Sequence, residues 1–218
     1  VTKAPGGAVR MVLNPAEDGT RAGVAVRDVA AGQACHLGPS DRTRVAYVYE
    51  GEDATITHTT ADSTATYDAG WRTGIYLEPG EDATIEATGS ELILLLFTVP
   101  KHTGRATGPE SPAGYFFDES RLRVLVDEKG FRRRTFWVNK ETGLSNAWDL
   151  QLGRMKYAAH AHSPRHVHHA STTSPVTPEH FYLIETGTGE VKHDSGSLPE
   201  AATTARPACA RTTTRITT

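Results

Sequence analysis

A series of short apolar or alternating runs, separated by Gly, Pro, Asp and Thr, constrains the fold of this chain most strongly. The runs are rich in β-branched and aromatic residues, which favour strands, and turn signals recur about every 8 to 12 residues, as in a β-sandwich or β-barrel. No helical period persists over several turns. We therefore predict an all-β fold. The predicted strands are residues 9–13, 23–29, 44–51, 53–60, 73–80, 82–89, 91–99, 122–126, 133–138, 148–158 and 180–186.

A segment rich in Pro, Gly and Ser, residues 108–121, separates the predicted strands into two sets. It predicts a linker with one short helical turn near FDES. A faint internal repeat supports two units: YVYEGEDATI (47–56) and YLIETGTGEV (182–191) share an aromatic strand, a Glu, a Gly-containing turn and a return strand. Such a repeat indicates a duplicated domain. We predict one domain at 1–107 and a second at 122–218.

Histidines gather in one part of the chain, with seven of the ten in residues 160–193. His166 and His168 are two residues apart, so in a strand both side chains lie on one face of the sheet. Glu179 and His180 begin the next predicted strand and point to opposite faces, so only one of them can join the pair. Desolvation favours His180 slightly, whereas a carboxylate is the usual third partner, and both stay open. This pattern predicts a site for one divalent transition metal ion.

The other histidines of the cluster, His160, His162 and His169, have several compatible roles. Each could support a ligand, contact a substrate or lie on the surface. Two interpretations without a specific site also remain. The imidazoles could be separately hydrogen-bonded surface groups, or they could form a histidine-rich loop that binds adventitious metal.

These residues resemble the cupin superfamily, and specifically the bicupins, which have two tandem β-barrels of the jelly-roll type. SPRHVHH (163–169) stands where the family has its His-x-His pair. EHFYLIETGTGEV (179–191) resembles the family's acidic residue, aromatic strand and Gly-x-Gly hairpin. The resemblance implies two tandem cupin-type barrels, the second of which carries the metal.

The resemblance also assigns the ligands residue by residue. His166 and His168 match the family's paired histidines. His180 lies at the family's spacing for the carboxylate or its replacement, with six residues between it and Gly187. Glu179 is one residue further away but has the expected residue type. A site with open coordination positions favours Fe2+, and Mn2+, Ni2+ or Zn2+ would fit the same donors.

The first half of the chain resembles the same fold with its metal ligands replaced. In RVAYVYEGEDATI, Arg44 stands where the family has a ligand. GWRTGIYLEPGEDATIEA resembles the second motif of the family, and Ala83 occupies the position of its histidine. We expect a degenerate first unit that binds no metal and serves packing or assembly.

The C-terminal tail departs from the family pattern. No histidine follows His193, so the second unit lacks the histidine of its own second motif and has at most three protein ligands. Residues 200–218, EAATTARPACARTTTRITT, contain one Ile and no aromatic residue. This composition predicts neither a strand pair nor a binding loop and resembles a truncated or frame-shifted terminus, which the mass of the native protein would test.

Composition excludes some partners. The net charge is −3, and no basic stripe with interleaved aromatic residues is visible, so nucleic acid is not expected. The longest apolar run, residues 92–99, is too short to cross a membrane, and no secretory leader opens the chain. Cys35 and Cys209 fit no disulfide or metal spacing and are expected to be buried or incidental thiols. A cytoplasmic location is therefore expected.

The resemblance implies a metal-dependent enzyme, with an Fe2+ dioxygenase acting on a small organic acid or phenolic substrate as the leading function. A metal-dependent decarboxylase, isomerase or lyase is the alternative within enzymes, because one fold supports many reactions. A non-catalytic module for small-molecule binding or assembly is the alternative outside enzymes. A homodimer is expected in each case.

Other conspicuous residues are assigned structural roles. Arg132 to Arg134 would alternate between two faces, which predicts a solvated edge strand. The tryptophans Trp71, Trp137 and Trp148 are expected in the core or at an interface between units. Tyr157 and Tyr182 are also expected in the core.

Overall fold

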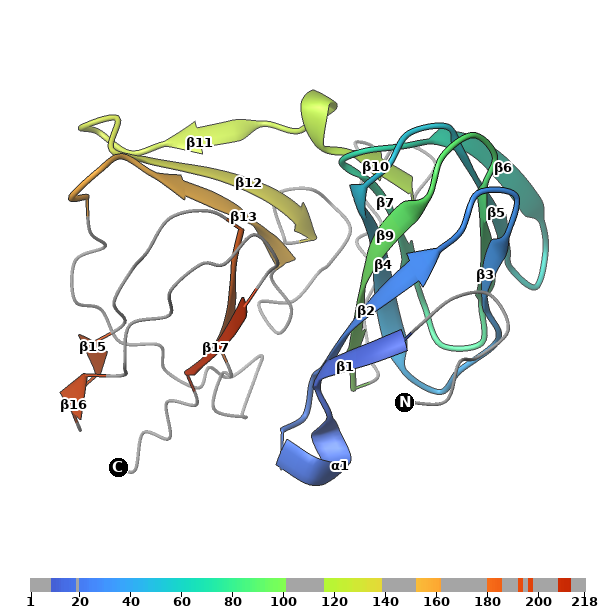
Figure 1. The fold of residues 1–218 in the computed structure, drawn as a ribbon, viewed down its shortest axis with the longest axis horizontal. Coiled ribbons are helices and arrows are strands. Elements are labelled where there is room, and N and C mark those ends of the chain that lie inside the picture. Colours follow the sequence, from blue (N-terminus) through green and yellow to red (C-terminus); the bar gives the residue numbers. More distant parts are fainter. Residues whose placement is uncertain are drawn as a thin grey trace. The chain divides into compact units, whose positions relative to one another are not determined.

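The computed structural model describes residues 9–18, 20–100, 116–138, 152–161, 180–185, 192–193, 196–197 and 208–212. The chain divides into two units, Val1–Arg165 and His166–Thr218. Nearly all regular structure is antiparallel β, as the sequence predicts (Figure 1). Among the described residues, no helix is long and apolar enough to cross a membrane.

The first unit contains two larger sheets. The six-stranded sheet has the order β1-β2-β9-β4-β7-β10, and the four-stranded sheet has the order β3-β8-β5-β6. This order, in which strands distant in sequence are neighbours in both sheets, is that of a jelly roll. The strands are β1 Val9–Leu13, β2 Gly23–Val29, β3 Ala34–Leu37, β4 Thr43–Glu50, β5 Ala54–Thr59, β6 Thr64–Ala69, β7 Thr73–Leu77, β8 Asp82–Ala87, β9 Leu92–Val99 and β10 Phe116–Asp118, with a short helix α1 at Pro15–Asp18.

The two sheets differ in how many of their faces are covered. Along β5, Ala54, Ile56 and His58 are buried while the intervening threonines are partly exposed, so this sheet has one core face and one solvated face. Along β4, every side chain from Val45 to Val48 is at most 1 % exposed. Both faces of the six-stranded sheet are therefore covered at β4. The continuous apolar run at residues 45–49 of β4 is typical of a strand with both faces covered.

A third sheet has the order β11-β12-β13, with β11 at Val124–Val126, β12 at Arg132–Val138 and β13 at Leu152–Tyr157. The prediction of an edge strand for Arg132 to Arg134 is wrong, because β12 pairs with a strand on each side. Alternation does spread the three arginines over both faces. Their long side chains are tolerated in a central strand because the sheet is short and its outer parts stay in contact with solvent.

The segment predicted as a linker forms structure in its second half. Phe116–Asp118 pairs with β7 as strand β10, and Glu119–Arg121 forms a 3-10 turn, η1. The side chain of Asp118 accepts a hydrogen bond from the backbone N–H of Ser120, which confirms the predicted helical turn. The pairing is stabilised by Phe117, which is 4 % exposed. The boundaries at 107 and 121 stay a prediction.

Close packing at this junction predicts the effect of one substitution. A Cβ on Gly74 would collide with the Phe117 ring and lie 2.6 Å from the carbonyl oxygen of Ala46. We expect Gly74→Ala to lower the free energy of unfolding by about 1–3 kcal/mol through overpacking. Urea unfolding would measure it. Gly38→Ala is the control, since an added Cβ would meet nothing closer than 3.5 Å, and an equal loss in both variants would contradict the packing argument.

In the second unit, β14 (His180–Ile184) pairs antiparallel with β17 (Ala208–Thr212), and β15 (Lys192–His193) pairs with β16 (Gly196–Ser197). The prediction that the C-terminal tail forms no strand pair is therefore wrong for residues 208–212. A ladder is built from backbone N–H and C=O groups, and threonine favours strands even where large apolar side chains are few.

Candidate functional site

Three of the four predicted metal ligands, His166, His168 and Glu179, lie outside the described residues. His180 is the first residue of β14 and stands opposite Thr212 of β17. The sequence prediction of a strand beginning at His180 is thus confirmed for the backbone. The meeting of the four side chains stays a prediction. His160, from the same cluster, is exposed and has a left-handed backbone with φ of 61°.

In the first unit, the position that the sequence resemblance assigns to a metal ligand holds a cation, the guanidinium of Arg44. The guanidinium of Arg44 donates from Nη1 to the carbonyl oxygen of Gly38 at 2.5 Å and from Nη2 to that of Glu81 at 2.6 Å. Burial lowers the pKa of Arg44, and the nearby carboxylates of Asp82 and Glu81 oppose this shift. Arg44 thus joins the residues before β4 to the turn before β8 by charge-assisted hydrogen bonds.

The other position that matches the family motif, Ala83, is fully buried and pairs in register with His58 of β5. His58 is 2 % exposed, and its Nε2 lies 3.2 Å from Oε2 of Glu81. The same oxygen accepts a hydrogen bond from the backbone N–H of Glu78 at 2.9 Å. The imidazole of His58 therefore stabilises the turn between β7 and β8 through Glu81.

His58 was not among the residues predicted from the sequence to have a functional role. Its signal was present, because His58 follows Ala54 and Ile56 at the spacing of the inward-facing residues of β5. An imidazole on a core face requires a polar partner, and the strand alone does not say which residue supplies it. Glu81 supplies it from 23 positions further along the chain.

The donor sets of the two units fit a metal ion unequally. Among the described residues, no group of three or more His, Cys, Asp and Glu side chains could hold an ion. In the first unit, a guanidinium and a methyl group stand at two of the matching positions, and neither can ligate a cation. In the second unit, the imidazoles and carboxylate of residues 166–180 are chemically suited to a first-row transition metal.

A second buried polar cluster surrounds Glu119 of η1, which is 8 % exposed. Its Oε2 accepts hydrogen bonds from the Tyr47 hydroxyl at 2.7 Å and from the Trp137 indole N–H at 3.2 Å. Its Oε1 accepts one from Nη1 of Arg154 at 3.3 Å, and Nη1 of Arg72 lies 4.0 Å away. One carboxylate thus links β4, β12, β13 and the turn before β7.

Aromatic rings pack around this carboxylate. Tyr47 and Trp137 are stacked with ring centroids 3.9 Å apart, and Phe117 lies 6.1 Å from Trp137. The predicted burial of Trp137 is confirmed, at 4 % exposed. Assignment to the core is wrong for Trp71 and Tyr157, which are 53 % and 41 % exposed. Trp71 instead supports the guanidinium of Arg72, which lies 3.9 Å from its ring centroid.

Solved structures that align with this chain identify the fold. A serine-to-alanine variant of Bacillus subtilis oxalate decarboxylase aligns with 65 % of this chain and 52 % of its own, at 13 % identity and a TM-score of 0.50. A second oxalate decarboxylase structure aligns with 64 % of this chain and 51 % of its own, at 13 % identity and a TM-score of 0.51. This chain has the all-β jelly-roll fold of the cupins. It spans about half the length of these two cupin structures.

No protein-family model matches the sequence, and no curated protein matches it. At 13 % identity, the structural similarity establishes the cupin fold and nothing about activity. The assignment of Arg44 and Ala83 to ligand positions of the family stays a prediction. They lie on β4 and β8, which belong to the two different sheets.

Proposed function

We propose that the chain belongs to a metal-dependent cupin enzyme whose active site lies in the second unit. The proposed ligands are His166 and His168 together with either His180 or Glu179. The observation that carries the proposal is the concentration of histidine side chains in residues 160–193 of a chain with a cupin fold. In the first unit, Arg44 and Ala83 stand at the positions that the resemblance assigns to metal ligands. The metal chemistry is therefore assigned to one unit only.

We propose a small organic acid or phenolic compound as the substrate. When bound, a divalent ion, with Fe2+ favoured over Mn2+, Ni2+ and Zn2+, supplies Lewis-acid chemistry and open positions for the substrate. The contribution of the protein is a set of three side chains. His166 and His168 must be neutral at their ligating nitrogens, and the third group, an imidazole or a carboxylate, sets the charge of the site.

Metal analysis tests this proposal. We expect protein purified without added metal to hold about one first-row ion per chain and His166→Ala to hold about a tenth of that, because two ligands rarely retain an ion. His160→Ala is the matched control, since His160 is exposed and belongs to the same cluster. A wild-type protein without metal, or equal loss in both variants, would contradict the proposal. Mass spectrometry under native conditions provides the count without an activity assay.

Two reactions are compatible with this proposal, and each consumes or releases a different gas that can be measured. A dioxygenase follows from a donor set with open coordination positions and consumes oxygen with its substrate. A decarboxylase is favoured by the structural similarity to oxalate decarboxylases, and oxalate is therefore the first compound to assay. Oxygen uptake and release of carbon dioxide, measured in parallel over a panel of small organic acids and phenols, distinguish the two.

A non-catalytic binding or assembly module is the second candidate, and the described part of the first unit favours it. Arg44 bonds to two backbone carbonyls, and the buried His58 is engaged by Glu81. An apo protein that binds an organic acid equally well before and after His166→Ala would support the module. We expect the first unit to serve assembly whichever function the second unit has.

A further inference from the structure

The described parts of the first unit carry opposite charges. Strands β1–β9 of the jelly roll and their connections, in residues 9–18 and 20–100, hold six arginines against fourteen Asp and Glu side chains, a net charge of −8. The β11–β13 sheet, in residues 121–138 and 152–157, holds eight Lys and Arg side chains against Asp127 and Glu128, a net charge of +6. Two of these cations, Arg121 and Arg154, form ion pairs with Asp118 and Glu119 of the adjoining segment. The whole chain has a charge of only −3. The charge is therefore segregated rather than absent.

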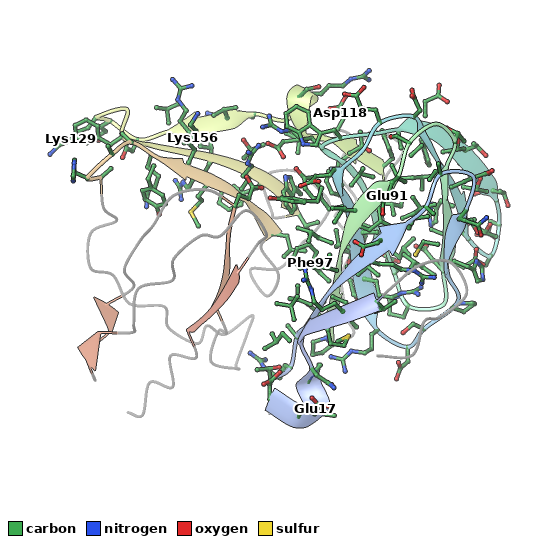
Figure 2. All side chains as sticks on the ribbon, viewed as in Figure 1. Glu17, Glu91, Phe97, Asp118, Lys129 and Lys156 are labelled. Carbon is green, nitrogen blue, oxygen red and sulfur yellow. The ribbon has the colours of Figure 1, made fainter. Side chains whose placement is uncertain are left out.

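The basic sheet also exposes apolar side chains. Of the seven large apolar side chains that are exposed among the described residues, five belong to this sheet and its turn: Val124, Val126, Phe131, Met155 and Tyr157, at 41 % to 53 % exposure. Patches that combine arginine with apolar and aromatic groups are typical of protein interfaces. Figure 2 shows Lys129 and Lys156 on this sheet.

One row of this sheet defines the basic face. Val126, Arg133 and Lys156 are register partners on three neighbouring strands, so their side chains lie on the same face. Arg133 and Lys156 are both exposed, as is Val126. The row therefore presents two cations beside an exposed apolar group.

A row of opposite charge lies on the solvated face of the four-stranded sheet. Asp68, Thr55 and Glu86 are register partners on β6, β5 and β8. Asp68 and Glu86 are exposed. This acidic face contains threonines but no large apolar side chain in the row. It presents carboxylates about two strand spacings, roughly 10 Å, apart.

We propose that the basic face, defined by Val126, Arg133 and Lys156, binds the acidic face, defined by Asp68, Thr55 and Glu86, of a second copy of this chain. The partner is the chain itself because it carries a complementary surface and is present at equal concentration. An extended polyanion is a poorer partner, since the remainder of the unit, at −8, would repel it. Two copies related by a two-fold axis would form this contact twice. The proposal does not depend on the metal site.

Charge exchange tests the contact. By sedimentation velocity, we expect the wild-type chain to self-associate at about 50 mM salt and to weaken about tenfold at about 500 mM. The double variant Arg133→Glu/Lys156→Glu, and separately Asp68→Lys/Glu86→Lys, should each lose self-association about tenfold or more, because each juxtaposes like charges. A mixture of the two variants should restore binding between them, since their reversed faces are complementary.

The control variant, Arg10→Glu/Arg21→Glu, changes the net charge equally at exposed arginines of the jelly roll and should associate like the wild type. Far-UV circular dichroism confirms that each variant is folded. A wild-type chain that is monomeric at low salt and about 100 µM would overturn the proposal. It would also be overturned if the mixed variants did not bind each other, or if the wild type bound single-stranded DNA or anionic vesicles but not itself.

Discussion

Glu119→Ala is expected to lower the free energy of unfolding of the first unit by about 3 kcal/mol, because it removes a buried acceptor shared by several donors. The carboxylate receives hydrogen bonds from Tyr47, Trp137 and Arg154 at 2.7 to 3.3 Å. These donors come from β4, β12 and β13, so the loss affects the attachment of the third sheet to the jelly roll. Urea unfolding followed by far-UV circular dichroism measures the change.

Two variants separate the charge of Glu119 from its shape. Glu119→Gln keeps one carbonyl acceptor but loses the charge that Arg154 contacts, and we expect an intermediate loss of about 1–2 kcal/mol. Glu128→Ala, at an exposed carboxylate of the turn after β11, should stay within about 0.5 kcal/mol of the wild type. If Glu119→Ala were as mild as Glu128→Ala, the carboxylate would not anchor the sheet.

Much of the fold was predictable because its strands have clear patterns. The bounds of β1 and β2 coincide with the predicted runs, and β4, β5, β7, β8 and β9 differ by a few residues at their ends. Strands β10, β15, β16 and β17 were missed, and so were β3 and β6, whose sequences, ACHL and TATYDA, are short and contain few large apolar residues. These segments are strands because the backbone of a neighbouring strand pairs with them through hydrogen bonds. The local sequence pattern carries no information about that pairing.

The buried polar clusters could not be predicted, because their partners are far apart in sequence. Tyr47 and Glu119 are separated by 72 positions and Arg154 and Glu119 by 35. Sequence periodicity indicates that Tyr47 faces a protein interior, but only the three-dimensional structure identifies the carboxylate that accepts the hydrogen bond of its hydroxyl group. The segment FDES predicted the helical turn and gave no sign that Glu119 within it is buried.

The proposed metal site stays a prediction, made only at the level of residue types. The spacing of His166 and His168 and their placement before a β-strand select imidazole donors, and the cupin fold supports the interpretation. The choice between Glu179 and His180 depends on which face of β14 is turned inward, and a shift of one residue in register reverses that choice. The register of His180 with Thr212 fixes the strand pairing but not the third ligand.

Trp137→Ala is expected to produce the largest loss of stability, about 3–5 kcal/mol, because it removes a large buried ring and leaves a cavity. Trp137 is 4 % exposed, stacks on Tyr47 and donates its indole N–H to Glu119. Urea unfolding followed by far-UV circular dichroism would measure the loss. Because Trp137 and Glu119 are in contact, the double variant Trp137→Ala/Glu119→Ala should lose less than the two single losses together.

Trp71→Ala is the matched substitution that separates burial from residue type. Sequence reasoning assigned Trp71 and Trp137 the same role, yet Trp71 is 53 % exposed and its ring contacts the guanidinium of Arg72. We expect its loss to cost about 1 kcal/mol or less, the size of an exposed cation–π contact. The two tryptophans differ because only Trp137 is buried against Tyr47. If Trp71→Ala and Trp137→Ala lowered the free energy of unfolding equally, the third sheet would not cover β4 in solution.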